Sequence, residues 1–238
     1  MENSLDFIEF IKSLNKQAYR LPLYLGRGRD NSDIVVDFPS AGSILMLGSA
    51  GTGKTMFAHS TICSLISSFS PDYLDFLLID LKEKEFKSYE NLSSIIEEPI
   101  YSSSEAIRAL NAMSITPGYK YQIVLIDTFS ELVFNYGTIL PRIIKNLTSR
   151  RNTFIIMWDS RPYEEIFSPE IKECFSSKII FNLQDKRHAK VIIDETTDEI
   201  PEEKGEAMIF CKESSSPIFA RCPYMSESDI LRVVSALR

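Results

Sequence analysis

A glycine-rich stretch at residues 48–55 holds the side chains best suited to chemistry. It matches the phosphate-binding pattern G-x-x-x-x-G-K-[ST] at every fixed position. In this pattern glycines let backbone N–H groups surround phosphate oxygens, the Lys54 ammonium bridges the β- and γ-phosphates, and the Thr55 hydroxyl binds Mg²⁺. We therefore predict ATP and Mg²⁺ as cofactors, with nucleotide contacts from Gly48, Ser49, Ala50, Gly51, Thr52, Gly53, Lys54 and Thr55.

The segments on either side of the glycine stretch fit this prediction. Residues 43–47 are an apolar run typical of a buried strand, and residues 56–66 have the composition of a helix. A strand, a glycine turn and a helix N-terminus together form an anion-binding cradle. The alternative, a chance glycine turn, would not require these two flanking elements.

An acid at the end of a later apolar strand is the second candidate. Asp127 closes the apolar run 121–126 downstream of the glycine stretch, where such proteins carry the carboxylate that holds Mg²⁺ together with Thr55. The alternative is a strand-end aspartate that only caps a loop. Asp127 and Thr55 are therefore the predicted metal ligands.

Hydrolysis also needs a group that orients and deprotonates the attacking water. In many such enzymes a glutamate directly follows the strand-end aspartate, but this position holds Thr128, whose hydroxyl is not a base near neutral pH. Glu131 is the catalytic candidate beside Asp127, and Asp159 is a further alternative. The sequence thus predicts nucleotide binding and leaves turnover open.

Apolar strands and helical segments alternate along the chain. We predict strands at 34–38, 43–47, 74–80, 99–101, 121–127, 152–159 and 177–182, a β-pair at 205–211 and 217–221, and helices at 56–66, 102–113, 138–150, 186–193 and 226–237. This order indicates an α/β fold, a doubly wound, mostly parallel sheet flanked by helices, with a C-terminal β-hairpin and helix. Residues 1–20 are predicted to be a lead-in helix and linker capped by Ser4, and residues 21–238 one domain.

Composition narrows the class of protein. The formal net charge is −7, which disfavours a dedicated nucleic-acid binder without excluding a local basic patch. The four cysteines are scattered, as expected of reduced thiols in the cytoplasm rather than of a metal site. No apolar run reaches membrane-spanning length and the start is unlike a signal peptide, so we expect a cytoplasmic module without direct membrane insertion.

Several segments resemble, in the same order, the ATPase domain of the FtsK/SpoIIIE group of P-loop motors. Residues 21–26 resemble its entry motif, residues 79–82 its I-D-P-K segment, residues 159–162 its T-Q-R-P segment and residues 205–208 its G-x-G-D-M-L region. The resemblance covers about residues 21–238 and implies a RecA-like P-loop NTPase fold. Two departures affect catalysis, namely Thr128 for the usual glutamate and Ser160 for the usual sensor glutamine.

Degenerate domains of this group that lack a DNA-reading winged helix resemble the C-terminal ATPase modules of the type VII secretion coupling protein (EssC/EccC-like). That resemblance implies secreted substrate proteins and neighbouring ATPase domains or subunits, including a hexamer, as partners of a soluble module of a membrane-anchored chain. Two alternatives stay open. One is a DNA translocase whose channel is lined by Arg142, Lys145, Arg150, Lys186, Arg187 and Lys190, and the other is a structural subunit with a vestigial phosphate loop.

Overall fold

The computed structural model describes residues 6–14, 18–82, 85–115, 119–195, 197, 199–212, 214 and 216–238. In this part of the chain nine strands form one sheet in the order β2-β1-β9-β8-β7-β3-β6-β5-β4. The strands are β1 Pro22–Gly28, β2 Asp33–Asp37, β3 Ile44–Leu47, β4 Leu74–Asp80, β5 Tyr121–Asp127, β6 Thr153–Asp159, β7 Ser177–Phe181, β8 Glu206–Phe210 and β9 Ile218–Arg221.

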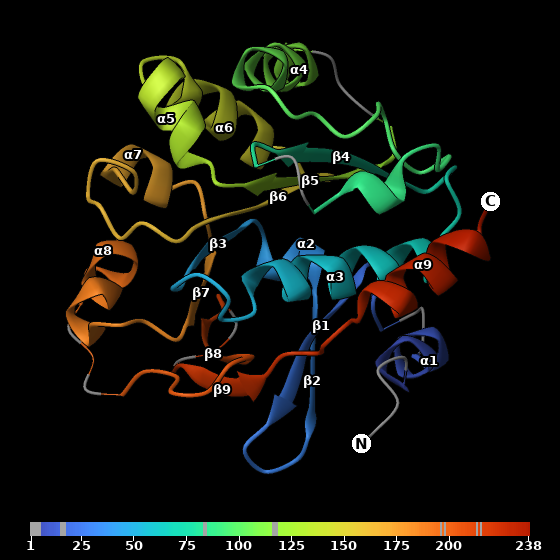
Figure 1. Ribbon diagram of the computed structural model, residues 1–238, viewed down its shortest axis with the longest axis horizontal. Helices are drawn as coiled ribbons and strands as arrows, with labels where there is room; N and C mark the ends of the chain where they lie inside the picture. Colours follow the sequence, from blue (N-terminus) through green and yellow to red (C-terminus); the bar gives the residue numbers. More distant parts are fainter. Residues whose placement is uncertain are drawn as a thin grey trace.

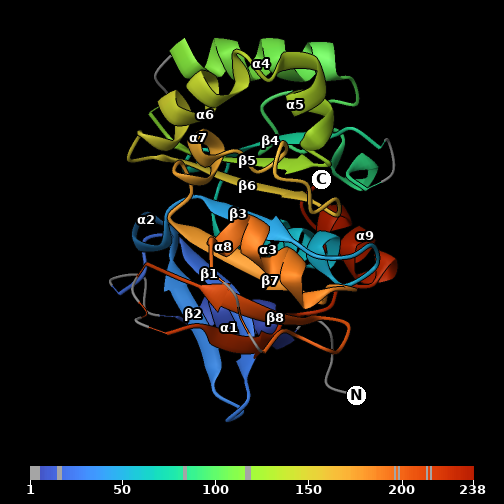
Figure 2. The ribbon, with the colours of Figure 1, turned by 90° about the vertical axis from the view of Figure 1, so that its left-hand side faces the viewer.

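The sheet has a parallel half and an antiparallel half. From β7 through β3, β6 and β5 to β4 all neighbours are parallel, as predicted for strands that alternate with helices. From β7 through β8, β9 and β1 to β2 all neighbours are antiparallel. The predicted C-terminal β-hairpin is thus confirmed as β8–β9, and it joins the β1–β2 hairpin to the parallel half across a twisted sheet (Figure 2).

Helices cover both faces of the sheet (Figure 1). One face packs against α1, α3 and α9, and the other against α4, α5, α6, α7 and α8. The helices and 3₁₀ turns are α1 Asp6–Ser13, α2 Phe38–Ala41, α3 Lys54–Ser68, η1 Lys87–Tyr89, α4 Ser103–Ile115, α5 Ser130–Tyr136, α6 Leu140–Thr148, α7 Pro169–Lys172, η2 Lys186–Ala189, α8 Lys190–Ile193 and α9 Glu227–Ser235.

Strand β3 shows how the sequence builds the two cores. Its residues are all buried, and because side chains alternate along a strand, Ile44 and Met46 belong to the core under α3 while Leu45 and Leu47 belong to the core under α6. Apolar side chains on both faces fix β3 at the centre of the sheet. The loop that follows it is therefore anchored at its start.

The structure corrects several element boundaries. The predicted strand at 99–101 is reduced to an isolated bridge between Ile79 and Ile100. The predicted helix at 138–150 begins at Leu140 and is preceded by α5, which the sequence pattern did not predict. The lead-in helix is present as α1, whereas Ser4 lies outside the described residues. None of the helices in the described ranges is long and apolar enough to cross a membrane.

Candidate nucleotide-binding site

The glycine loop connects the central strand β3 to the first turn of α3 (Figure 1). Two of its glycines have backbone conformations that L-residues rarely adopt, with φ of +76° at Gly51 and +126° at Gly53. Gly53 is the N-cap of α3, and its carbonyl accepts the N–H of Phe57 at 2.9 Å. The loop therefore directs its backbone into the N-terminus of a long helix, the arrangement predicted for phosphate binding.

Residues outside the motif hold the glycine loop through hydrogen bonds. The Ser49 N–H donates to the Asn182 carbonyl at 2.9 Å, and the Gly205 N–H donates to the Thr52 carbonyl at 2.8 Å. Gln184 donates its N–H to the Ser49 hydroxyl at 3.2 Å. The end of β7 and the start of β8 thus fix the loop conformation. The sequence did not predict that Asn182 supports the loop, because its main-chain carbonyl makes the contact and its side chain does not.

Among the glycines of the loop, Gly48 leaves the least space for a Cβ atom. A Cβ atom there would lie 2.6 Å from the Cβ of Phe181, whereas a Cβ at Gly51 would meet nothing within 4 Å. We expect Gly48→Ala to lower the free energy of unfolding by about 3 kcal/mol, since Phe181 Cβ cannot move without β7. Gly51→Ala, the matched control, should lower it by only about 1 kcal/mol through its positive φ. Urea unfolding measures both, and equal losses would contradict this packing.

The Lys54 side chain folds along the inside of the loop. Its Nζ donates to the carbonyls of Gly48 at 2.7 Å and Ser49 at 2.8 Å, and the residue is only 5% exposed. Burial lowers the pKa of the Lys54 ammonium to about 8; the charges of Asp127 and Asp159 oppose this shift and that of Lys82 adds to it. The site therefore holds a partly desolvated cation that a phosphate group would favour in its charged form.

The lowered pKa of Lys54 predicts a pH dependence. Between about pH 8 and pH 10.5 the unfolded chain keeps a proton that the folded chain has lost, so this group makes the free energy of unfolding rise with pH there.

Phosphate binding instead favours the protonated form of Lys54. We expect ATP affinity to fall by up to about tenfold per pH unit above pH 8, with proton uptake on binding. Calorimetry at pH 7 and pH 9 in buffers of different ionisation heat tests this, and binding without proton uptake at pH 9 would contradict it.

Asp127 ends β5, two strands away from the glycine loop. Its neighbour across the sheet is Trp158 of β6, and the next residue of β6, Asp159, pairs with Leu47 at the end of β3. Parallel strands bring these carboxyl ends to one edge, so Asp127, Asp159 and the glycine loop share that edge. Asp127 is 3% exposed, and burial raises the pKa of its carboxyl, opposed by a hydrogen bond from Thr128 and by the charge of Lys82.

Thr128 adopts a strained backbone conformation beside this carboxylate. Its φ is +58°, which costs a β-branched residue about 1–2 kcal/mol. Its N–H donates to the Trp158 carbonyl at 3.0 Å, and its hydroxyl donates to Asp127 Oδ1 at 2.8 Å. The side chain at the position of the usual catalytic glutamate is therefore a hydrogen-bond donor to the carboxylate predicted to bind the metal. Strained residues of this kind cluster at functional sites.

The two carboxylates that could replace the missing glutamate are both held by other groups. Asp159 accepts the backbone N–H groups of Ser130, Ser160 and Arg161 at 2.8–3.0 Å. Glu131, in the first turn of α5, pairs with Arg161 at 2.9 Å, and Arg161 Nε lies 3.4 Å from Asp159 Oδ1. This arrangement fixes the ends of β5 and β6. The catalytic role of Glu131 stays a prediction.

The residues present fit Mg²⁺. In proteins this ion takes one or two carboxylates and fills its other positions with water and phosphate oxygens. A buried carboxylate such as Asp127 requires a cation nearby. Thr55 in the first turn of α3 supplies the hydroxyl, so these two residues would hold the ion, which neutralises phosphate charge when bound. In the described ranges no cluster of three His, Cys, Asp or Glu side chains offers an alternative metal site.

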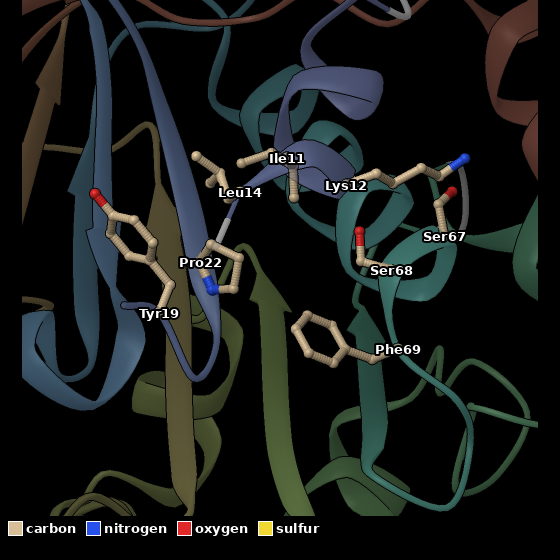
Figure 3. A pocket seen from close by; sticks show the side chains of 8 residues that line it. All are labelled: Ile11, Lys12, Leu14, Tyr19, Pro22, Ser67, Ser68 and Phe69. Carbon is tan, nitrogen blue, oxygen red and sulfur yellow. The ribbon is translucent and has the colours of Figure 1, made fainter. Parts of the chain in front are cut away.

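A cavity of about 200 Å³ lies at the opposite end of α3, lined among others by Ile11, Pro22, Ser68 and Phe69 (Figure 3). Because α3 has 15 residues, each rising about 1.5 Å, this cavity is roughly 20 Å from Lys54. It contributes no side chain to the phosphate-binding edge and is separate from the candidate site.

A glycine loop between a central parallel strand and a helix, with a buried acid at the end of a nearby strand, defines a P-loop NTPase fold. Within this class, residues 11–125 match the model of the FtsK/SpoIIIE family. The family resemblance predicted from the sequence is thereby confirmed. A P-loop ATPase family implies nucleotide binding.

Curated relatives are DNA translocases at low identity. The chain is 24% identical to the DNA translocase FtsK of Chlorobaculum tepidum over 257 residues, covering 92% of this chain and 32% of that protein. The FtsK of Leptospira interrogans is also 24% identical, with 92% of this chain and 27% of that protein covered. The chain thus spans about a third of the length of the curated relatives it matches.

Solved structures with the same fold come from secretion and conjugation proteins. The type VII secretion ATPase EccC of Thermomonospora curvata superposes with a TM-score of 0.75 at 17% identity, covering 95% of this chain and 33% of that one. The pCW3 conjugation coupling protein TcpA with ATPγS superposes with a TM-score of 0.74 at 17% identity, covering 92% of this chain and 71% of that one. EssC (ATPases 2 and 3) of Geobacillus thermodenitrificans has a TM-score of 0.72 at 18% identity, covering 91% of this chain and 48% of that one. These similarities confirm the predicted fold.

Proposed function

We propose that this chain is an ATP-binding module of a type VII protein secretion motor, with weak or no hydrolysis of its own. The observation that carries the proposal is Thr128, which places a hydroxyl on Asp127 where a catalytic carboxylate is usual. Glu131 and Asp159, the two carboxylates that could replace it, are both engaged with Arg161. The module would then use ATP as a ligand that sets its conformation rather than as fuel.

Residues 21–238 form the proposed nucleotide-binding module, with α1 as a lead-in element. Its partners are ATP, secreted substrate proteins and neighbouring ATPase domains or subunits. The names of two structural relatives support this choice, since EccC is a type VII secretion ATPase and another EccC structure is a complex with a signal sequence peptide. Arginine fingers of such motors are supplied by a neighbour, which fits a module that is inactive alone.

A DNA translocase is the second candidate, because the curated relatives carry that name. Of the basic residues expected to line a channel, Arg150 donates to the carbonyls of Met113 and Ser114, and Arg187 donates to both carboxylate oxygens of Asp185. The Arg150 contacts hold that guanidinium within the domain, whereas the Arg187 side chain stays 86% exposed. The Arg150 contacts and the net charge of −7 favour a protein substrate.

DNA binding separates the two candidates. We would measure the anisotropy of a labelled duplex with the wild type and with an Arg142→Glu/Lys145→Glu variant, both residues being exposed on α6. The secretion proposal expects no binding at 50–200 mM salt and no effect of DNA on ATP turnover. Binding that falls steeply with salt, weakens in the variant and stimulates turnover would support the translocase instead.

A further inference from the structure

A second lysine approaches the metal-binding carboxylate from the side opposite the glycine loop. Lys82 follows the end of β4, where its backbone N–H donates to Asp80 Oδ1 at 3.1 Å. Asp80 is fully buried and pairs in register with Asp127 of β5. Asp80 also accepts the N–H groups of Glu85 at 2.6 Å and Phe86 at 3.3 Å. A buried carboxylate thus fixes the backbone from which the Lys82 side chain extends.

The Lys82 ammonium extends over the edge of the sheet toward the candidate nucleotide site. Its Nζ lies 3.9 Å from Asp127 Oδ1, and the side chain is 49% exposed. Burial is the main cause of the lowered pKa of Lys54, and the charge of Lys82 contributes to it. Asp127 therefore has one lysine on the β3 side and another on the β4 side.

The contact between Lys82 and Asp127 is electrostatic and leaves donors available. A distance of 3.9 Å exceeds that of an N–H···O hydrogen bond. Asp127 Oδ1 already accepts the Thr128 hydroxyl at 2.8 Å. An ammonium has three donors, and the half-exposed, flexible Lys82 side chain can turn them toward a stronger anion at low cost.

We propose that Lys82 is a second cationic contact for the terminal phosphate of a nucleoside triphosphate, and that it makes the site distinguish a triphosphate from a diphosphate. This inference rests on the nucleotide site of the proposed function. Lys54 and the loop hold the phosphate chain from the β3 side. With Asp127 holding Mg²⁺, the Lys82 ammonium would turn to the γ-phosphate of a triphosphate, and a diphosphate has no such group.

The test compares the Kd values of ATPγS–Mg²⁺ and ADP–Mg²⁺ by calorimetry. Lys82→Met should weaken ATPγS binding about tenfold, the value of one charge-assisted hydrogen bond, and leave ADP binding within a factor of about two. Lys82→Arg, which keeps the charge, should retain most of the preference. Lys120→Met is the matched control, because Lys120 is 40% exposed and pairs with Asp75 of β4 at the amino end of the strand.

The outcomes separate this inference from the proposed function. Equal weakening of both nucleotides by Lys82→Met, or tighter binding, would overturn the inference and make Lys82 a counter-ion of Asp127 only. Unchanged ATPγS affinity in Lys82→Met, with binding still lost in Lys54→Ala, would also overturn it while leaving the nucleotide site intact. Failure of the wild type to bind either nucleotide would overturn both.

Discussion

Lys54→Ala is expected to abolish ATP–Mg²⁺ binding while leaving the domain folded. In the structure the Lys54 ammonium donates to the carbonyls of Gly48 and Ser49 at the edge of the glycine loop. Hydrogen bonds from a charged group contribute about 1.5–3 kcal/mol each, so two contacts to phosphate correspond to a loss of affinity of at least about 100-fold. Calorimetry of the variant and the wild type measures this loss.

The folded state should tolerate this change. Alanine removes two hydrogen bonds but also relieves the desolvation of a buried ammonium, so the free energy of unfolding should change by no more than about 1 kcal/mol. Thermal unfolding followed by circular dichroism provides the control, with Lys120→Ala as a variant remote from the site. Unchanged ATP affinity in a folded Lys54→Ala protein would refute the phosphate-loop assignment.

The second large effect concerns turnover. Wild-type hydrolysis at saturating ATP is expected to be barely above background, because Thr128 supplies no general base and such a base is worth about 10²–10⁴-fold. Thr128→Glu should restore only part of the activity. The substitution removes the hydroxyl contact to Asp127, and Ser160 still occupies the position of the usual sensor glutamine. A steady-state phosphate-release assay measures both proteins.

Robust turnover by the wild type, lost in Lys54→Ala, would contradict the degenerate-site account. Glu131→Gln would then identify the base, since in the described part of the chain the Glu131 carboxylate pairs with Arg161 and accepts no backbone N–H. Asp159→Asn is the less clean variant, because Asp159 accepts three backbone N–H groups and its change would destabilise the junction of β5 and β6.

The parallel half of the fold was predictable because its strands are continuous apolar runs bounded by turn residues. Strands β3 to β7 and the start of α3 follow directly from this pattern. Helix α5 was missed because seven residues beginning with Ser130 are too short for a helical period to emerge. The extension of the sheet through β8, β9 and β1 depends on long-range pairing, which local sequence does not specify.

The candidate site was also predictable from the sequence only in part. The phosphate motif and Asp127 were identifiable by residue type and position. The conformation of Thr128 was not, since a positive φ at a β-branched residue contradicts its own preference and is imposed by the turn at Trp158. The support of Ser49 by Asn182 and of Thr52 by Gly205 was also hidden, because backbone groups make these contacts.

The most direct test of a nucleotide-binding module is a calorimetric titration of the purified wild type with ATP–Mg²⁺ up to millimolar concentrations. We expect saturable binding of one nucleotide per chain, displaced by ADP. No binding at millimolar ATP would contradict it, and would make the glycine loop vestigial and the chain a structural subunit.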